Sequence, residues 1–325
     1  MEENAFENRV DLTALNENVQ KIKDEVGKVI VGQEQMVTLL ITAILADGHV
    51  LIEGVPGVAK TLTAKLLSRV VSVKFSRIQF TPDLMPSDVL GTSIFNVKTS
   101  DFEFKAGPIF ANIVLIDEIN RAPAKTQAAL FEAMEERQVT IDGHTYRLGH
   151  PYMVVATQNP VEHEGTYRLP EAQLDRFLFK ILVDYPDLNQ EVAILNGHHE
   201  RKGDEVMNVV QSVLDAAQLE TYRRTVRQIL VEAPLISYIA QIVQETRSNP
   251  ALFLGASPRA SVAVLNSAKA FAAINGRDFV TPEDIKFVAL PVLRHRVILT
   301  PDKEMEGVSA DEVVKQIIDK IEVPR

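Results

Sequence analysis

The sequence predicts an α/β domain followed by a smaller helical domain. Up to about residue 187, short apolar runs alternate with segments whose apolar residues recur every three or four positions. Two of these runs, residues 50–52 and 113–116, are continuous, as in parallel strands that are buried on both faces. Beyond Pro186 helical periodicity takes over. We therefore expect domains at residues 8–187 and 188–325.

Composition narrows the class of protein. The 325 residues carry a formal net charge of -10, which argues against broad nucleic-acid binding. The absence of cysteine excludes a disulfide framework, a thiolate zinc site and a cysteine nucleophile. No apolar run approaches the ~20 residues of a membrane span, and the N-terminus lacks the basic start and apolar core of a signal peptide. We expect a cytoplasmic protein with no transmembrane segment.

The first elements follow from hydrophobic spacing. Apolar residues at helical intervals predict one amphipathic helix over residues 15–29 and a second over residues 37–45. The strand at residues 50–52 comes next, and a helix with apolar residues at helical spacing over residues 62–70 follows it. Alternation over residues 72–80 predicts a second strand.

Two hairpins interrupt the alternation of strands and helices. We expect residues 92–110 to form a β-hairpin insertion that carries three aromatic side chains. These side chains either pack against the body of the protein or contact a partner. Residues 138–149 form a second hairpin around Asp142-Gly143, a strong two-residue turn signal.

The remaining elements of the first domain are two helices and two strands. We expect a helix from Pro123 to about Glu135, a buried strand over residues 153–156, a short helix that starts at Pro170, and a fifth strand over residues 179–183. After Pro186 the predicted elements are all helices.

The turn between the 50–52 strand and the next helix has the spacing of a phosphate-binding loop. Gly54 and Gly57 let the backbone wrap around phosphate oxygens, and the N–H groups at a helix start favour an anion. Lys60 can reach the β- and γ-phosphates, and Thr61 can offer its hydroxyl to Mg²⁺. The common pattern has glycine where this chain has Ala59, which we expect to adopt helical dihedral angles that tolerate a methyl group. The expected nucleotide contacts are Gly54, Val55, Pro56, Gly57, Val58, Ala59, Lys60, Thr61 and Leu62.

Polar residues end two of the predicted strands. Asp117 and Glu118 follow the 113–116 strand, at the edge where an open α/β sheet places its ligands. Asp117 can hold Mg²⁺ opposite Thr61, and Glu118 can accept a proton from an attacking water. Asn159 ends the next apolar strand, where it could orient water or contact the γ-phosphate if the two strands are neighbours; the alternative is an Asn-Pro turn.

Two arginines further along the chain are candidates for phosphate contacts. Arg176 could stabilise transition-state charge on the γ-phosphate of a neighbouring subunit; the alternative is an intrachain salt bridge with Asp175 or Glu171. Arg259 begins a helix of the second domain, from which it could reach phosphate across the interdomain cleft. The alternative for Arg259 is a capping or surface role.

Together, these motifs resemble the MoxR family of AAA+ ATPases. The resemblance rests on Gly54-Val-Pro-Gly-Val-Ala-Lys-Thr61, Ile113-Val-Leu-Ile-Asp-Glu-Ile-Asn-Arg-Ala122, Ala156-Thr-Gln-Asn-Pro160, Leu169-Pro-Glu-Ala-Gln-Leu-Asp-Arg-Phe177 and Gly255-Ala-Ser-Pro-Arg-Ala260. It implies a P-loop AAA+ core of the helix-2-insert clade, with a five-stranded parallel sheet flanked by helices, followed by an all-α lid domain. The two hairpins fit the insert positions of that clade.

The resemblance also implies roles for the site residues. ATP and Mg²⁺ would be bound, with Lys60 and Thr61 as phosphate and metal contacts and Asp117 as a metal ligand. Glu118 would be the catalytic base. The remaining roles would be sensor 1 for Asn159, the arginine finger supplied in trans for Arg176, sensor 2 for Arg259, and adenine packing for Val31 and Gly32.

The family typically forms hexameric rings with a chaperone-like role, acting on partners that bear von Willebrand factor A domains. We therefore expect an oligomeric Mg²⁺-dependent ATPase that remodels or activates a protein client. One alternative is a nucleic-acid motor, because helicase relatives share the hairpin inserts; the acidic chain lacks a dense basic cluster. Another is a nucleotide-gated binding scaffold with little turnover, against which Glu118 argues.

Overall fold

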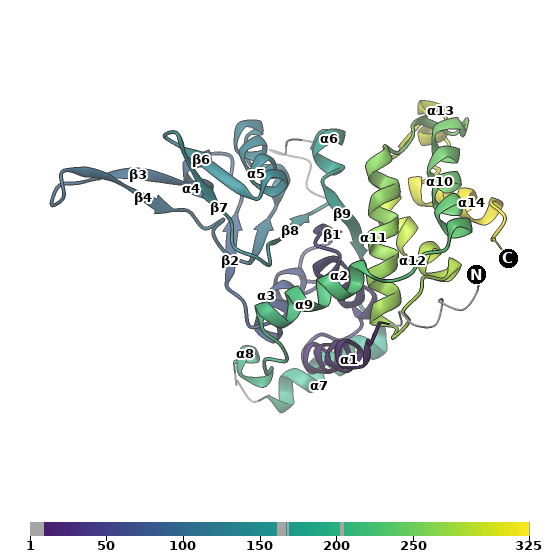
Figure 1. Cartoon of the computed structure of the whole chain (residues 1–325), viewed down its shortest axis with the longest axis horizontal. Coiled ribbons are helices and arrows are strands. Elements are labelled where there is room, and N and C mark those ends of the chain that lie inside the picture. Colours follow the sequence, from purple (N-terminus) through teal and green to yellow (C-terminus); the bar gives the residue numbers. More distant parts are fainter. Residues whose placement is uncertain (1–9, 161–166, 168, 202–204, 325) are drawn as a thin grey trace, which may run out of the picture.

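The structure, a computed structural model, describes residues 10–160, 167, 169–201 and 205–324. Residues 8 and 9, at the start of the expected first domain, and residue 325 lie outside this range. At the centre is a parallel sheet of five strands in the spatial order β2-β5-β8-β1-β9 (Figure 1). The strands are β1 (His49–Gly54), β2 (Phe75–Gln79), β5 (Ile113–Asp117), β8 (Met153–Gln158) and β9 (Phe177–Val183). The expected five-stranded parallel fold is confirmed.

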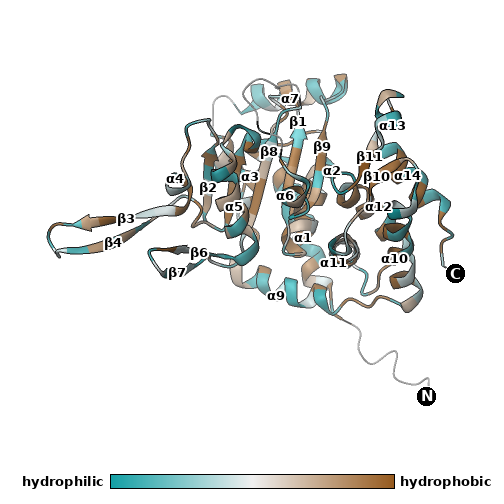
Figure 2. Ribbon diagram, turned by 90° about the horizontal axis from the view of Figure 1, so that it is seen from above, coloured by the Kyte–Doolittle hydropathy of each residue, from teal (hydrophilic) through white to brown (hydrophobic). Residues whose placement is uncertain are grey.

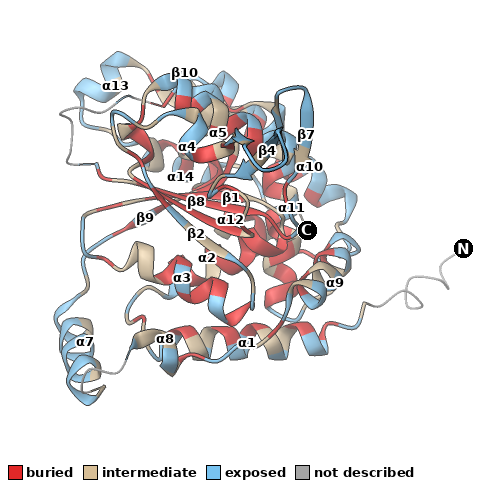
Figure 3. Cartoon of the chain, turned by 90° about the vertical axis from the view of Figure 1, so that its left-hand side faces the viewer, coloured by how far each residue is buried: buried red, intermediate tan, exposed pale blue. Residues whose placement is uncertain are grey.

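Helices cover both faces of this sheet because its strands are apolar on both sides. Val50 and Ile52 pack into the apolar cluster that contains the first helices, whereas Leu51 between them packs into the cluster of α5. The central strands are buried almost throughout (Figure 3). The flanking helices are α1 (Thr13–Gly27), α2 (Glu34–Leu45), α3 (Lys60–Val70), α5 (Ala124–Glu136) and the short α6 (Glu171–Leu174).

The first hairpin projects from the body of the protein (Figure 1). It consists of β3 (Gly91–Asn96) and β4 (Asp101–Ala106) and follows the short α4 (Pro86–Leu90). The Phe95 and Phe102 side chains are paired across the strands and are 50% and 69% exposed. Phe104, at the base, stacks on Tyr146 with ring centroids 4.0 Å apart. The outer aromatic residues therefore face solvent, and the inner one packs down.

The second hairpin supports the base of the first. It consists of β6 (Gln138–Ile141) and β7 (His144–Arg147), joined at Asp142 and Gly143. Both turn residues have positive φ, 50° and 78°, which matches the strand twist in a two-residue hairpin. The expected hairpin is confirmed, and its Tyr146 provides the stacking surface described above.

The second half of the chain is mainly helical. Its helices are α7 (Leu188–Glu200), α8 (Val206–Val209), α9 (Ala216–Arg227), α10 (Ala233–Ser248), α11 (Pro258–Ile274), α12 (Pro282–Leu293), α13 (Pro301–Met305) and α14 (Ala310–Lys320). The same half of the chain also contains two short antiparallel strands, β10 (Leu252–Leu254) and β11 (Ile298–Leu299), which pair with each other. The sequence pattern predicts no strand here, because two to three residues are too few to show alternation.

Helix α9, which precedes the lid in the sequence, packs against the sheet domain. Arg223 of α9 is 1% exposed, donates from Nε to the Ile44 carbonyl oxygen at 2.7 Å, and lies 3.0 Å from the Asp47 carboxylate. One apolar cluster also runs from α1 and α2 into α11 and α12; Figure 2 colours the ribbon of the chain by the hydropathy of each residue. The boundary at residue 187 therefore stays a prediction. Within the described residues, no helix combines the length and apolar character needed to cross a membrane.

Candidate functional site

The phosphate loop connects β1 to α3 at the carboxyl edge of the sheet, where parallel α/β sheets hold their ligands. Gly54 is required by close packing, because a Cβ there would lie 2.5 Å from the Val183 carbonyl oxygen of β9. Gly57 has a φ of +87°, which favours glycine. The Lys60 ammonium folds back and donates to the Gly54 carbonyl oxygen. The loop thus surrounds the start of α3, where N–H groups without helical acceptors favour an anion.

Ala59 does not have the helical dihedral angles expected from the sequence. It lies at φ 59° and ψ 18°, in the left-handed region, immediately before the first residue of α3. A Cβ in this region approaches the following carbonyl oxygen and costs about 1 kcal/mol or more. The expectation that the methyl group is tolerated without strain is therefore corrected: the loop keeps the backbone shape that glycine would adopt freely.

This strain makes glycine more favourable here than in a helix. In Ala59→Gly, relief of strain offsets the added entropy of the unfolded chain, so we expect stability equal to the wild type or higher by about 0.5 kcal/mol. The matched control is Ala128→Gly on the exposed face of α5, where glycine should cost about 1 kcal/mol. Urea unfolding measures both. Equal losses in the two variants would contradict a left-handed Ala59.

Three side chains converge on the buried carboxylate of Asp117. Thr61 and Thr157 donate their hydroxyls to Oδ1 over 3.3 and 3.1 Å, and Arg77 Nε lies 2.6 Å from Oδ2. A hydroxyl and a carboxylate next to a phosphate loop are the oxygen donors that Mg²⁺ takes in P-loop enzymes. The residues therefore fit the metal: Thr61 and Asp117 would hold it, and it would neutralise phosphate charge.

Glu118 is held in place from two sides. Its Oε2 accepts a hydrogen bond from Gln79 at 2.8 Å and lies 3.1 Å from Nε of Arg121. Its own N–H donates to Thr157 Oγ1 at 3.1 Å, and its φ of 57° is unusual for a residue other than glycine. Such backbone strain is concentrated at functional sites. These contacts hold the carboxylate in place, and its role as a base for an attacking water stays a prediction.

Asn159 lies at the same edge of the sheet. It follows β8, which pairs with β5 on one side and with β1 on the other. The sequence-based role of Asn159 requires that the strand before it be a neighbour of the strand before Glu118. The two strands are paired, so this requirement is met. Asn159 is buried, and the strand before it lies between β1, which leads into the phosphate loop, and β5, which ends at Asp117. Its role as a phosphate or water contact stays a prediction.

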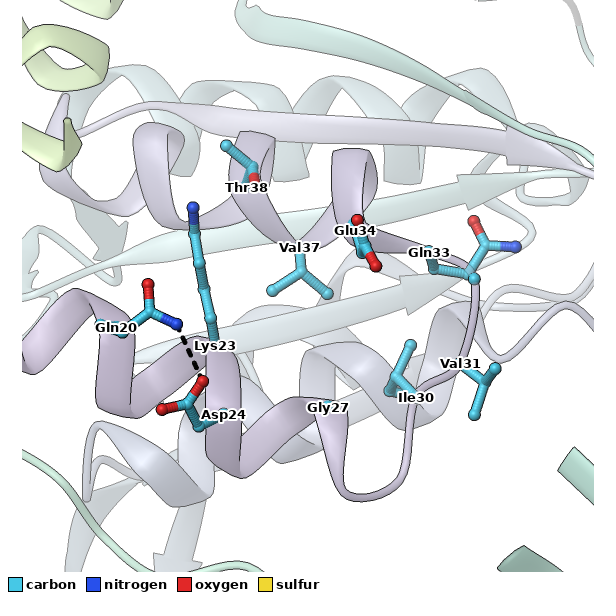
Figure 4. A pocket seen from close by; sticks show the side chains of 11 residues that line it. Gln20, Lys23, Asp24, Gly27, Ile30, Val31, Gln33, Glu34, Val37 and Thr38 are labelled. Carbon is cyan, nitrogen blue, oxygen red and sulfur yellow. Dashed lines mark hydrogen bonds between the residues drawn. The ribbon is translucent and has the colours of Figure 1, made fainter. Parts of the chain in front are cut away.

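The proposed adenine segment is also at this edge. Gln33 donates from its side chain to the Asp184 carbonyl oxygen at the end of β9, and a Cβ on Gly32 would meet the Gln190 side chain of α7. Val31 and Gly32 also line a cavity of 480 Å³ between α1 and α2, shown in Figure 4. No residue of the phosphate loop lines that cavity. Adenine packing on Val31 and Gly32 stays a prediction.

Arg176 lies at the opposite edge of the sheet. It immediately precedes Phe177, which pairs with His49 at the start of β1, whereas Gly54 pairs with Val183 at the other end. Five residues of strand separate the two levels, roughly 16 Å at about 3.3 Å per residue. This distance exceeds the reach of an arginine side chain. Arg176 therefore cannot contact a phosphate bound in its own chain.

Arg259 lies beside Arg176 instead of reaching across a cleft to its own phosphate loop. Its Nη2 is 2.7 Å from Glu135 Oε1, and Arg176 Nη1 forms an ion pair with Glu135 Oε2. The sequence offers an intrachain salt bridge with Asp175 or Glu171 as the alternative role of Arg176; the structure shows an intrachain ion pair with Glu135 at the end of α5. Sheet geometry is the reason: α5 runs back from the carboxyl edge, so its last residues lie at the amino edge with Arg176.

Several residues of this arrangement are not evident from the sequence. Gln79 and Thr157 contact Glu118 and Asp117 because their strands flank β5, and strand order is not encoded in local spacing. A signal exists for both, since each is a polar residue at the carboxyl end of an apolar strand. Glu135 gives no comparable signal, because its sequence context is an ordinary exposed helix end.

Comparisons with known proteins agree with this geometry. A profile of the "ATPase family associated with various cellular activities (AAA)" matches residues 49–179, and one of the "AAA lid domain" matches residues 244–317. The chain is 44% identical to "Chaperone MoxR1" of Mycobacterium tuberculosis, over 93% of this chain and 81% of that protein. The chain belongs to the MoxR family of AAA+ ATPases.

Other relatives extend over the same length. "Protein MoxR" of Methylorubrum extorquens is 29% identical over 96% of this chain and 97% of its own, and "Uncharacterized protein YeaC" of Bacillus subtilis is 47% identical over 94% of both. A crystal structure described as a "putative ATPase" from Cytophaga hutchinsonii superposes with a TM-score of 0.89 at 42% identity, covering 96% of this chain and 97% of that one. The arrangement of core and lid found here is thus shared with a solved structure over nearly the whole chain.

Proposed function

We propose that this MoxR-family protein hydrolyses ATP with Mg²⁺ in a hexameric ring of identical subunits, as its family resemblance implies, and uses the energy to remodel a protein client. One observation carries the proposal. The phosphate loop, Asp117 and Glu118 lie at the carboxyl edge of the sheet, whereas Arg176 and Arg259 lie at the amino edge. Only a second copy can bring the two halves together, and a head-to-tail contact of this kind forms a ring where its rotation closes.

Each residue has a task in the proposed reaction. Glu118 takes a proton from the water that attacks the γ-phosphorus, and the bond to the ADP oxygen breaks as the new P–O bond forms. Lys60 and the N–H groups of the loop stabilise charge on the β- and γ-phosphates. Mg²⁺, held by Thr61 and Asp117, would neutralise part of the phosphate charge. The neighbour's Arg176 and Arg259 stabilise the transferring phosphoryl group.

A protein is the client that best fits the exposed surface. The projecting hairpin presents Phe95, Phe102 and Val97 to solvent, and Val97 is 81% exposed. Exposed apolar groups of this kind favour protein contacts over nucleic acid, whose backbone requires positive charge. By the family resemblance, we propose a partner with a von Willebrand factor A domain. The name "Chaperone MoxR1" of one relative supports a chaperone-like role.

Dilution tests the shared site. If each site needs a neighbour, phosphate release per subunit should rise with protein concentration and level off once rings are complete. Single-stranded DNA or RNA should leave this curve unchanged. A rate per subunit that is independent of concentration down to monomer would contradict the proposal. Stimulation by nucleic acid would favour a motor, and absent turnover in intact rings would favour a scaffold.

A further inference from the structure

Glu135 joins the two arginines that the proposed reaction needs. Its two carboxylate oxygens contact different guanidinium groups: Oε2 that of Arg176 from the sheet domain, and Oε1 that of Arg259 from the lid. The Glu135 side chain is about one third exposed and that of Arg259 is 61% exposed, so the group lies at the surface. A single carboxylate therefore sets the distance between two cations that would otherwise repel each other.

Arg176 is held through one nitrogen of its guanidinium group. Among the described residues, its contacts are made by Nη1, which both pairs with Glu135 and donates to the Phe131 carbonyl oxygen at 2.8 Å. Within the described part of the chain, Arg176 Nε is buried without a hydrogen-bond partner. A guanidinium group has five N–H donors in a fixed plane. Contacts at Nη1 with both Glu135 and the Phe131 carbonyl oxygen therefore hold this plane in a fixed orientation.

The end of α5 that carries Glu135 is anchored to the sheet. His49 Nε2 lies 3.2 Å from the Met134 carbonyl oxygen, while its Nδ1 accepts from the Val154 N–H at 3.0 Å. Burial lowers the pKa of His49 to about 3, so the ring is neutral and can serve as donor and acceptor at once. Arg137, two residues on, donates to the Tyr152 carbonyl oxygen at 2.6 Å. Glu135 thus projects from a fixed helix end.

From this geometry we propose that Glu135 is a positioning residue that presents Arg176 and Arg259 as a pair to the phosphate of a neighbouring subunit. The proposal rests on the proposed function, because it concerns how the second half of the shared site is held. It assigns a task to a residue outside the nucleotide-binding motifs. It also links the lid to hydrolysis, since a displaced lid would withdraw Arg259 from Glu135.

A subunit-mixing experiment isolates this task from any effect on the nucleotide pocket of the same chain. Arg176→Ala subunits keep a phosphate loop but lack the finger, so they depend on donor subunits. The donor carries Lys60→Ala, which inactivates its own site, with or without Glu135→Gln. We expect the rate restored by the donor to fall about tenfold when Glu135→Gln is added, with KM for ATP changed less than twofold. Adding Glu135→Asp instead should recover part of the loss.

The matched control is a donor with Lys60→Ala and Glu136→Gln, which removes the neighbouring exposed carboxylate and should restore as much activity as Lys60→Ala alone. Native mass spectrometry counts the donors in each ring, so rates are compared per incorporated donor. Equal or faster rescue by the Glu135→Gln donor would overturn the proposal. If the Lys60→Ala donor itself restores nothing in mixed rings, the proposed function fails instead.

Discussion

Glu118→Gln should bind ATP as the wild type does but lose hydrolysis by about 10²- to 10⁴-fold. The amide has nearly the shape of the carboxylate and can still accept a hydrogen bond from Gln79, whose side chain donates to Glu118 Oε2. It cannot take the proton of the attacking water. Phosphate release and binding of a fluorescent ATP analogue measure the two quantities separately.

The control for this prediction is Glu132→Gln on the exposed face of α5, which removes the same charge away from the site. It should leave both binding and hydrolysis unchanged. Turnover that survives in Glu118→Gln would show that another group takes the proton. Loss of ATP binding would show that Glu118 holds the pocket together instead of acting on water.

Arg176→Ala should lose about 10³- to 10⁵-fold in turnover, the range found where an arginine finger operates. The variant keeps its phosphate loop, Asp117 and Glu118, so ATP binding should persist. Loss of an ion pair with the partly exposed Glu135 should change stability little. Turnover, nucleotide binding and ring size are measured on the same preparation. A loss of turnover below tenfold in intact rings would contradict an in-trans finger.

Local sequence signals predict most of the fold and the carboxyl-edge half of the site. The phosphate loop and the Asp117-Glu118 pair each follow an apolar run, and the two-residue turn at Asp142-Gly143 has its own signature. Such features depend only on the spacing of residues within one segment, and this spacing can be read directly from the sequence. The resemblance to the MoxR family relies on the same segments.

What the sequence does not predict depends on contacts between segments. The meeting of Arg176 and Arg259 on Glu135 follows from strand register and from the length of α5, which returns its last turn to the amino edge. Ala59 differs for another reason. Its left-handed backbone is imposed by the loop against the residue's own preference, so its side chain gives no hint of it.

Mixing two inactive variants tests the shared site most directly. Arg176→Ala subunits provide phosphate loops and Lys60→Ala subunits provide arginines. In random equimolar rings about a quarter of the interfaces combine an intact loop with an intact finger. We therefore predict recovery to about a quarter of the wild-type rate per subunit, while each variant alone stays inactive. Rings that mix the two variants, shown by mass, yet release no phosphate would contradict a site shared between neighbours.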